Sequence, residues 1–225
     1  MTLSSTIECL FAGGTGALDL EGHRSGIFKR QIHGHARIEV DGLVGDEHAD
    51  SRVHGGPEKA VHQYAAENYA RLADAFAERA NALVPGALGE NLSAYGLSEC
   101  NVHIGDVFAA GTAVLQVSQP RSPCWKINHR FGVDRMSVYV MQTRITGWYY
   151  RVISPGVVRA GDQMTLLERQ TDQVSIDRFW QVQLAHRPTI EDLTILANVP
   201  GLAPDWKRRL SERMRWLSAQ SCPPS

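Results

Sequence analysis

The segment NVHIGDVFAAGTAVLQVSQ, residues 101–119, decides the class of fold. Short runs rich in apolar and β-branched residues lie on both sides of Ala110-Gly111, which predicts two strands joined by a tight turn. The Gly105-Asp106 pair before the first run recurs as Gly161-Asp162 before another strand-like run. Repetition of a turn-plus-strand unit is typical of a barrel of short strands. The sequence therefore predicts a mainly β fold.

The neighbouring segments extend this pattern and add helices. Residues 32–44 alternate apolar and polar side chains around a turn at Asp41-Gly42, and residues 147–168 predict two or three further strands. Apolar residues recur at helical spacing over residues 65–83, which predicts an amphipathic helix. A shorter helix is expected from Asp134, as its N-cap, to about Gly147.

The pattern changes after Glu168, where three helical segments follow at residues 175–186, 189–198 and 204–219. We therefore expect a boundary near residue 169, with a β-barrel domain over residues 1–168 and a three-helix domain over residues 169–225. The second unit is too small to be stable unless it docks on the barrel or on a partner.

Composition excludes several classes of function. The 23 Lys and Arg residues nearly balance the 24 Asp and Glu residues, so no global positive charge attracts nucleic acid or an anionic membrane. No apolar run reaches the roughly 18 residues of a membrane span, and no basic segment precedes the first apolar run. We expect a cytoplasmic protein that is a monomer or a homodimer.

The segment QPRSPCWKI, residues 119–127, contains the cysteine with the most activating surroundings. Pro120 and Pro123 restrict the backbone that leads to Cys124, and Arg121 and Lys126 favour its thiolate form. A thiolate presented in this way acts as a nucleophile or as a metal ligand. The four cysteines contain no C-x-x-C pair, so we expect free thiols and no zinc ribbon.

Two Gly-rich stretches add polar groups on predicted turns. Gly55-Gly56-Pro57 would group Arg52, His54 and Lys59 around one concave turn, a pattern that suits a phosphate or an oxyanion. Asn91, in GENL, could bind an amide or heterocycle edge through its paired donor and acceptor.

The carboxylates and histidines between Asp46 and His54 leave a third possibility open, a metal-dependent hydrolase that needs no cysteine. A serine-nucleophile elbow, a phosphate-binding P-loop and a dinucleotide fingerprint have no match in the sequence.

Several of these motifs occur in a fixed order, namely GDEHAD…VHGGPEKAVHQY, GENLSAYGL, IGDVF, VSQPRSPCWK and TGWYYRV. In this order they resemble the MOSC domain family, and within it the YiiM-like branch. The resemblance covers roughly the first three quarters of the chain, Lys29 fits the family's first motif, and the C-terminal segment resembles the helical domain appended in that branch. It implies a MOSC β-barrel with interspersed helices.

The resemblance also implies a cofactor and a reaction. It makes Cys124 the protein ligand to molybdenum in a bound molybdenum cofactor (molybdopterin), and the expected cofactor-binding residues are Lys29, Arg52, His54, Lys59, Asn91 and Arg121. The implied reaction is detoxifying reduction of N-hydroxylated compounds, such as 6-N-hydroxylaminopurine, to amines. The alternative is a carrier of persulfide sulfur on Cys124, or a cofactor-binding module without turnover.

A molybdenum enzyme of this kind needs a separate electron-donor protein, because the sequence has no motif for a flavin, a haem or an iron–sulfur cluster. The last predicted helix contains five cations that could bind an acidic donor, although a solvated face is the simpler explanation. They are Lys207, Arg208, Arg209, Arg213 and Arg215.

Overall fold

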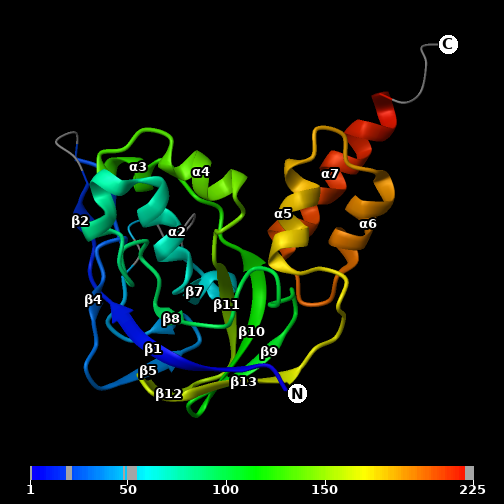
Figure 1. The fold of residues 1–225 in the computed structure, drawn as a ribbon. Coiled ribbons are helices and arrows are strands. Elements are labelled where there is room, and N and C mark those ends of the chain that lie inside the picture. Colours follow the sequence, from blue (N-terminus) through cyan, green and yellow to red (C-terminus); the bar gives the residue numbers. More distant parts are fainter. Residues whose placement is uncertain (1, 19–21, 48, 50–54, 221–225) are drawn as a thin grey trace.

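The computed structural model of the chain describes residues 2–18, 22–47, 49 and 55–220. Within these residues seven strands close into a mixed barrel in the order β1-β13-β9-β10-β11-β7-β8 and back to β1 (Figure 1). Only the β7–β8 pair is parallel among these barrel neighbours. The strands are β1 (Ser4–Ala12), β7 (Val61–Ala65), β8 (Leu92–Ala94), β9 (Val107–Ala110), β10 (Ala113–Pro120), β11 (Trp148–Ser154) and β13 (Gln163–Glu168). The predicted mainly β fold is confirmed.

The β9–β10 hairpin shows why the sequence folds in this way. The backbone turns at Gly111 with φ of 57°, and a Cβ atom at this position would lie 2.3 Å from the Val157 carbonyl oxygen. Along β10 the side chains of Ala113, Leu115 and Val117 alternate inwards and are buried. The predicted pair of strands is therefore present where the sequence places it.

Short strands extend the barrel at its edges. β12 (Gly156–Arg159), β5 (His35–Glu39) and β6 (Gly42–Leu43) form a three-stranded sheet that includes the predicted turn at Asp41-Gly42. β4 (Arg30–Gln31) pairs with the end of β1, and β2 (Gly16–Ala17) pairs with β3 (Arg24–Ser25).

The helix predicted over residues 65–83 is wrong in its bounds. A 3-10 turn, η1 (Pro57–Lys59), leads into β7, and the helix proper is α2 (Asn68–Ala75). Phe76, at φ −131° and ψ 61°, ends α2 and begins a second 3-10 segment, η2 (Ala77–Ala82).

The helices between β10 and β11 also differ from the prediction. The helix expected after Asp134 is α4 (Met136–Gln142), and its N-cap is Arg135, which has φ of 67°. The sequence analysis missed α3 (Lys126–Phe131), which follows Cys124 closely. Within the described residues no helix has the length and apolar character needed to cross a bilayer.

The three C-terminal helices are confirmed as α5 (Ile176–Leu184), α6 (Ile190–Asn198) and α7 (Pro204–Gln220), which lie beside the barrel in Figure 1. Thr189 caps α6, because its Oγ1 accepts a hydrogen bond from the Asp192 N–H at 2.9 Å. The buried rings of α5 and Leu210 of α7 belong to the same hydrophobic cluster as the barrel side chain Phe108. The helices therefore dock on the barrel, and the division at residue 169 stays a prediction.

Candidate functional site

Cys124 lies in the loop between β10 and α3. The Arg121 N–H that follows β10 donates to the Gly147 carbonyl at 3.0 Å, and the Ile127 N–H donates to the Cys124 carbonyl at 3.1 Å. These bonds fix the backbone on both sides of the half-buried Cys124 side chain. The thiol is a free one, as predicted for this position.

A pocket opens beside this loop. Its volume is about 650 Å³, including the space at its opening to solvent. Its walls come from the β3–β4 region, β7, the segment before β8, β11 and the Cys124 loop. Four of the predicted site residues lie in its lining. They are Lys29, Asn91, Arg121 and Cys124.

Two cations close to Cys124 in the chain lie in this lining, Arg121 in the loop and Lys126 at the start of α3. Arg121 is 7% exposed, and its Nη2 donates to the Leu88 carbonyl at 3.2 Å. Lys126 donates from Nζ to the Arg24 carbonyl at 3.1 Å, which ties the loop to β3. The bonds are to neutral carbonyls, so neither cation is neutralised by these contacts and both add positive charge near the thiol.

Lys29 also lines the pocket, but its charge has a partner. Its ammonium forms an ion pair with Asp46, and both side chains are almost fully buried. Burial lowers the pKa of Lys29, and the nearby Asp46 carboxylate opposes that shift. The Gly13 N–H donates to Asp46 Oδ1 at 3.1 Å, so the carboxylate is fixed from two sides.

Asn91 joins this ion pair to β7. Its Nδ2 donates to Asp46 Oδ2 at 2.9 Å and to the Phe11 carbonyl at 3.2 Å, and its Oδ1 accepts from the His62 N–H at 2.9 Å. Both ends of the amide therefore have protein partners. In the structure Asn91 braces the pocket wall, and its expected contact with a heterocycle edge stays a prediction.

Of the remaining predicted residues, only Lys59 is among the described ones, and it lies elsewhere. Lys59 lines a second cavity of about 890 Å³ between the barrel and α7, together with Asp205 and Arg209. Burial lowers the pKa of Lys59, and the Asp205 carboxylate opposes the shift. Arg52 and His54 fall outside the described residues.

The alternative hypothesis of a metal-dependent hydrolase has one candidate metal ligand fewer in this structure, namely Asp46. Asp46 is already engaged by Lys29, Asn91 and the Gly13 N–H. No group of three or more His, Cys, Asp or Glu side chains that could hold a metal ion is found among the residues that the structure describes. The histidines of the 46–54 loop lie outside those residues.

The sequence analysis missed two residues that line the pocket, His62 and Tyr149. Both lie in strands, on the paired β7 and β11, where they are opposite one another and their ring centroids are 5.1 Å apart. All five residues of β7 are buried, so this strand lacks the alternation that would have predicted it. The only feature of the sequence that could have indicated His62 as a site residue is the occurrence of a histidine inside such a buried run.

The chain is similar to several known proteins. A family model described as "MOSC domain" matches residues 50–165. Protein YiiM of Escherichia coli (strain K12) is 40% identical over 194 residues, which are 86% of each chain. A protein named "Reductase" from Gibberella moniliformis (strain M3125 / FGSC 7600) is 37% identical over 177 residues, 78% of this chain and 31% of that protein.

The fold is shared with the same bacterial relative. The crystal structure of YiiM from Escherichia coli aligns with a TM-score of 0.79 and covers 95% of this chain and 94% of that chain. Sequence identity in the structural alignment is 32%. Coverage of this extent includes the C-terminal helices as well as the barrel.

Proposed function

Because the chain belongs to the MOSC domain family, we propose that it binds the molybdenum cofactor through Cys124 and reduces N-hydroxylated compounds to amines. The family match and the relative named "Reductase" support an oxidoreductase of the MOSC type. The observation that most supports cofactor binding through Cys124 is the presence of Cys124, Arg121 and Lys126 in the lining of one pocket.

The donor set of this pocket suits that cofactor. One thiol is too few ligands for a bare metal ion, which commonly takes about four donors in a structural site. A metal that arrives with organic sulfur ligands needs only one more soft donor, and a cysteine thiolate is such a donor. Arg121 and Lys126 complement the negative charge of a phosphorylated cofactor.

The other residues position this set. Asp46 neutralises the buried Lys29 and, through Asn91, fixes the edge of β7 against β1. Lys59 lines the second cavity, so the proposed binding set keeps Lys29, Asn91, Arg121 and Cys124 and adds Lys126. Arg52 and His54 remain predicted contributors from outside the described residues.

When bound, the cofactor supplies two-electron redox chemistry. Reduction of an N–OH group to N–H consumes two electrons and two protons and releases water. The protein must therefore receive electrons from a separate donor, and its own residues bind the substrate and shield the reaction from bulk water.

The test is metal analysis and native mass spectrometry of protein made in a molybdenum-replete host. We expect wild type and the control Cys100→Ser, which changes an exposed thiol, to hold a molybdopterin species. Cys124→Ser should lose most of the molybdenum. The same molybdenum content in all three proteins, or none in the wild type, would contradict the proposal. A mass increase of one sulfur atom on Cys124 without molybdenum would instead favour the persulfide carrier.

A further inference from the structure

The wall of the pocket formed by His62 and Arg121 contains polar atoms without partners. His62 is 4% exposed and Arg121 is 7% exposed, and both line the pocket. His62 Nε2 and Arg121 Nη1 are each buried and lack a hydrogen-bond partner. A buried polar group without a hydrogen-bond partner destabilises the folded protein. This wall therefore favours a ligand that supplies the two missing partners.

The rest of both side chains is held in place. The backbone N–H of His62 donates to Asn91 Oδ1, and Arg121 Nη2 donates to the Leu88 carbonyl. The His62 ring also lies 5.1 Å from the Tyr149 ring. The two unpaired nitrogens therefore belong to side chains that are anchored on several sides, which is the condition for selective recognition.

The two nitrogens have opposite hydrogen-bonding character. Burial and the Arg121 charge lower the pKa of His62 well below its usual value, with a smaller contribution from Lys29 in the same direction. A backbone hydrogen bond with Gly89 opposes this shift. A neutral imidazole has one acceptor nitrogen, a role open to the unpaired Nε2, whereas Arg121 Nη1 can only donate.

We propose that His62 Nε2 and Arg121 Nη1 together recognise the N–O–H group of the substrate. Nε2 accepts the hydroxyl hydrogen, and Nη1 donates to the hydroxyl oxygen or to an acceptor beside it. Cys124 lines the same pocket, so a group held at this wall shares the cavity with the thiol. The inference rests on the proposed function for the nature of the ligand. The amine product has no hydroxyl group, so it cannot form the same two hydrogen bonds with this pair as the substrate.

Calorimetric titration of the molybdenum-loaded full chain, without an electron donor, tests this pair. The ligands are 6-N-hydroxylaminopurine and its O-methyl ether, which lacks the hydroxyl donor. We expect wild type to bind the ether about tenfold more weakly, the effect of one lost hydrogen bond to a buried partner. His62→Leu should reduce that ratio to about twofold or less, and His62→Gln, which keeps an acceptor, should retain part of it.

His186→Gln, which changes an exposed histidine between α5 and α6, serves as the matched control and should keep the wild-type ratio. Equal binding of the two ligands to wild type, no detectable binding of either, or an unchanged ratio in folded His62→Leu overturns the inference. If His62→Leu does not fold, ¹⁵N spectra of wild type decide the question. The Nε2 signal should then move with the hydroxyl ligand and stay in place with the ether.

Failure of this inference is distinguishable from failure of the proposed function. The proposed function depends on molybdenum retention through Cys124, which is measured by metal analysis of the same samples. Protein that retains molybdenum but does not discriminate the two ligands contradicts only the role of His62 and Arg121. Protein without molybdenum that still discriminates them contradicts only the proposed function.

Discussion

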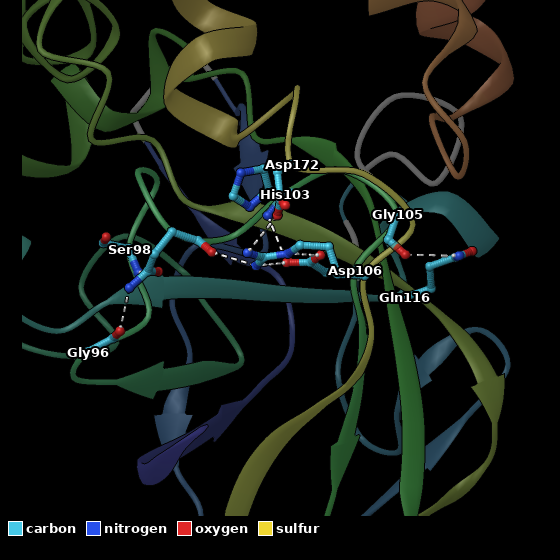
Figure 2. A network of polar contacts seen from close by, with 9 residues as sticks. Gly96, Ser98, His103, Gly105, Asp106, Gln116 and Asp172 are labelled. Atoms are coloured by element: carbon cyan, nitrogen blue, oxygen red, sulfur yellow. Dashed lines mark hydrogen bonds and ion pairs between the residues drawn. The ribbon is translucent and has the colours of Figure 1, made fainter. Parts of the chain in front are cut away.

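Asp106 and Arg169 form an ion pair that joins the start of β9 to the segment leading into the C-terminal helices. The Asp106 side chain is fully buried, and it accepts hydrogen bonds from Arg169 Nε at 2.9 Å and from Nη2 at 2.7 Å. The same carboxylate accepts the His103 N–H at 2.9 Å (Figure 2). Arg169 Nη2 also donates to the Asn101 carbonyl at 2.7 Å. One carboxylate thus fixes the barrel turn and the connecting segment together.

We expect Asp106→Asn to lower the free energy of unfolding by about 3–5 kcal/mol, because it leaves the Arg169 charge without its buried partner. Urea unfolding monitored by tryptophan fluorescence measures this change. Asp172→Asn is the matched control, since Asp172 also pairs with Arg169 but its side chain is 83% exposed. That variant should lie within about 0.5 kcal/mol of wild type. A loss for Asp106→Asn no larger than that of the control would contradict the argument.

The Lys29–Asp46 pair beside the pocket allows a test of coupling. Asp46→Asn alone leaves a buried ammonium unpaired, so we expect a loss of about 3–5 kcal/mol in stability and weaker cofactor retention. Lys29→Met in the Asp46→Asn background should recover part of the loss, with a coupling energy of about 0.5–3 kcal/mol. A double-mutant cycle from urea unfolding gives this energy. Strictly additive effects would show that the two charges do not stabilise each other.

His62 predicts a dependence of stability on pH. Its pKa is lowered in the folded protein, chiefly by burial, so between that value and about 6.5 the unfolded chain binds a proton that the folded chain does not. Stability therefore rises with pH in this window and falls as the pH drops below about 6.5. The slope from one such group is at most about 1.4 kcal/mol per pH unit.

Urea unfolding at several pH values between about 5 and 8 measures this slope. The His62→Gln variant should show a shallower decline in acid than wild type, because it lacks this titrating group. His103, whose pKa is also lowered by burial, contributes to both proteins and cancels in the comparison. Identical slopes for wild type and His62→Gln would show that His62 does not resist protonation.

Strands that flank glycine turns were predictable from the sequence, and β7 was not. The β9–β10 hairpin shows alternation and a turn that requires Gly111, whereas β7 is buried on both faces and pairs in parallel with β8. Periodicity over residues 65–83 identified the buried faces of Tyr69 and Leu72, but it could not show that the backbone leaves the helix at Phe76. Which residues face a core is a local property, and the continuity of a helix depends on tertiary packing.

The same distinction applies to the site. Asn91, Arg121 and Cys124, which line the pocket, were expected because they lie on or beside turns, where polar groups need a functional or capping explanation. Lys29 was expected because it fits the family's first motif. His62 and Tyr149 reach the pocket from strands and were missed. Lys59 is close to His62 in the chain but lines the second cavity, because η1 ends between them and changes the direction of the backbone. Only the fold decides which of two neighbouring residues faces a given cavity.

The cations of α7 lead to the last prediction, which concerns the proposed electron donor. Arg208 pairs with Asp205 and Glu212, Arg209 pairs with Asp205, and Arg213 donates to carbonyls at the end of α5. Substituting these three would therefore disturb the helix itself. Lys207 and Arg215 are exposed, and they form no ion pair within the part of the chain that the structure describes. They are the better probes of a charged docking surface.

We expect Lys207→Glu with Arg215→Glu to slow turnover driven by an acidic donor protein by about tenfold at low salt and to flatten its salt dependence. Turnover with a small chemical reductant should stay at the wild-type rate, because that reductant needs no docking surface. Lys207→Gln with Arg215→Gln, which removes the charges without reversing them, should give an intermediate rate. Wild-type rates and an unchanged salt dependence in the Glu variant would place the donor on another face, since a donor steered by α7 must respond to a reversal of its charge.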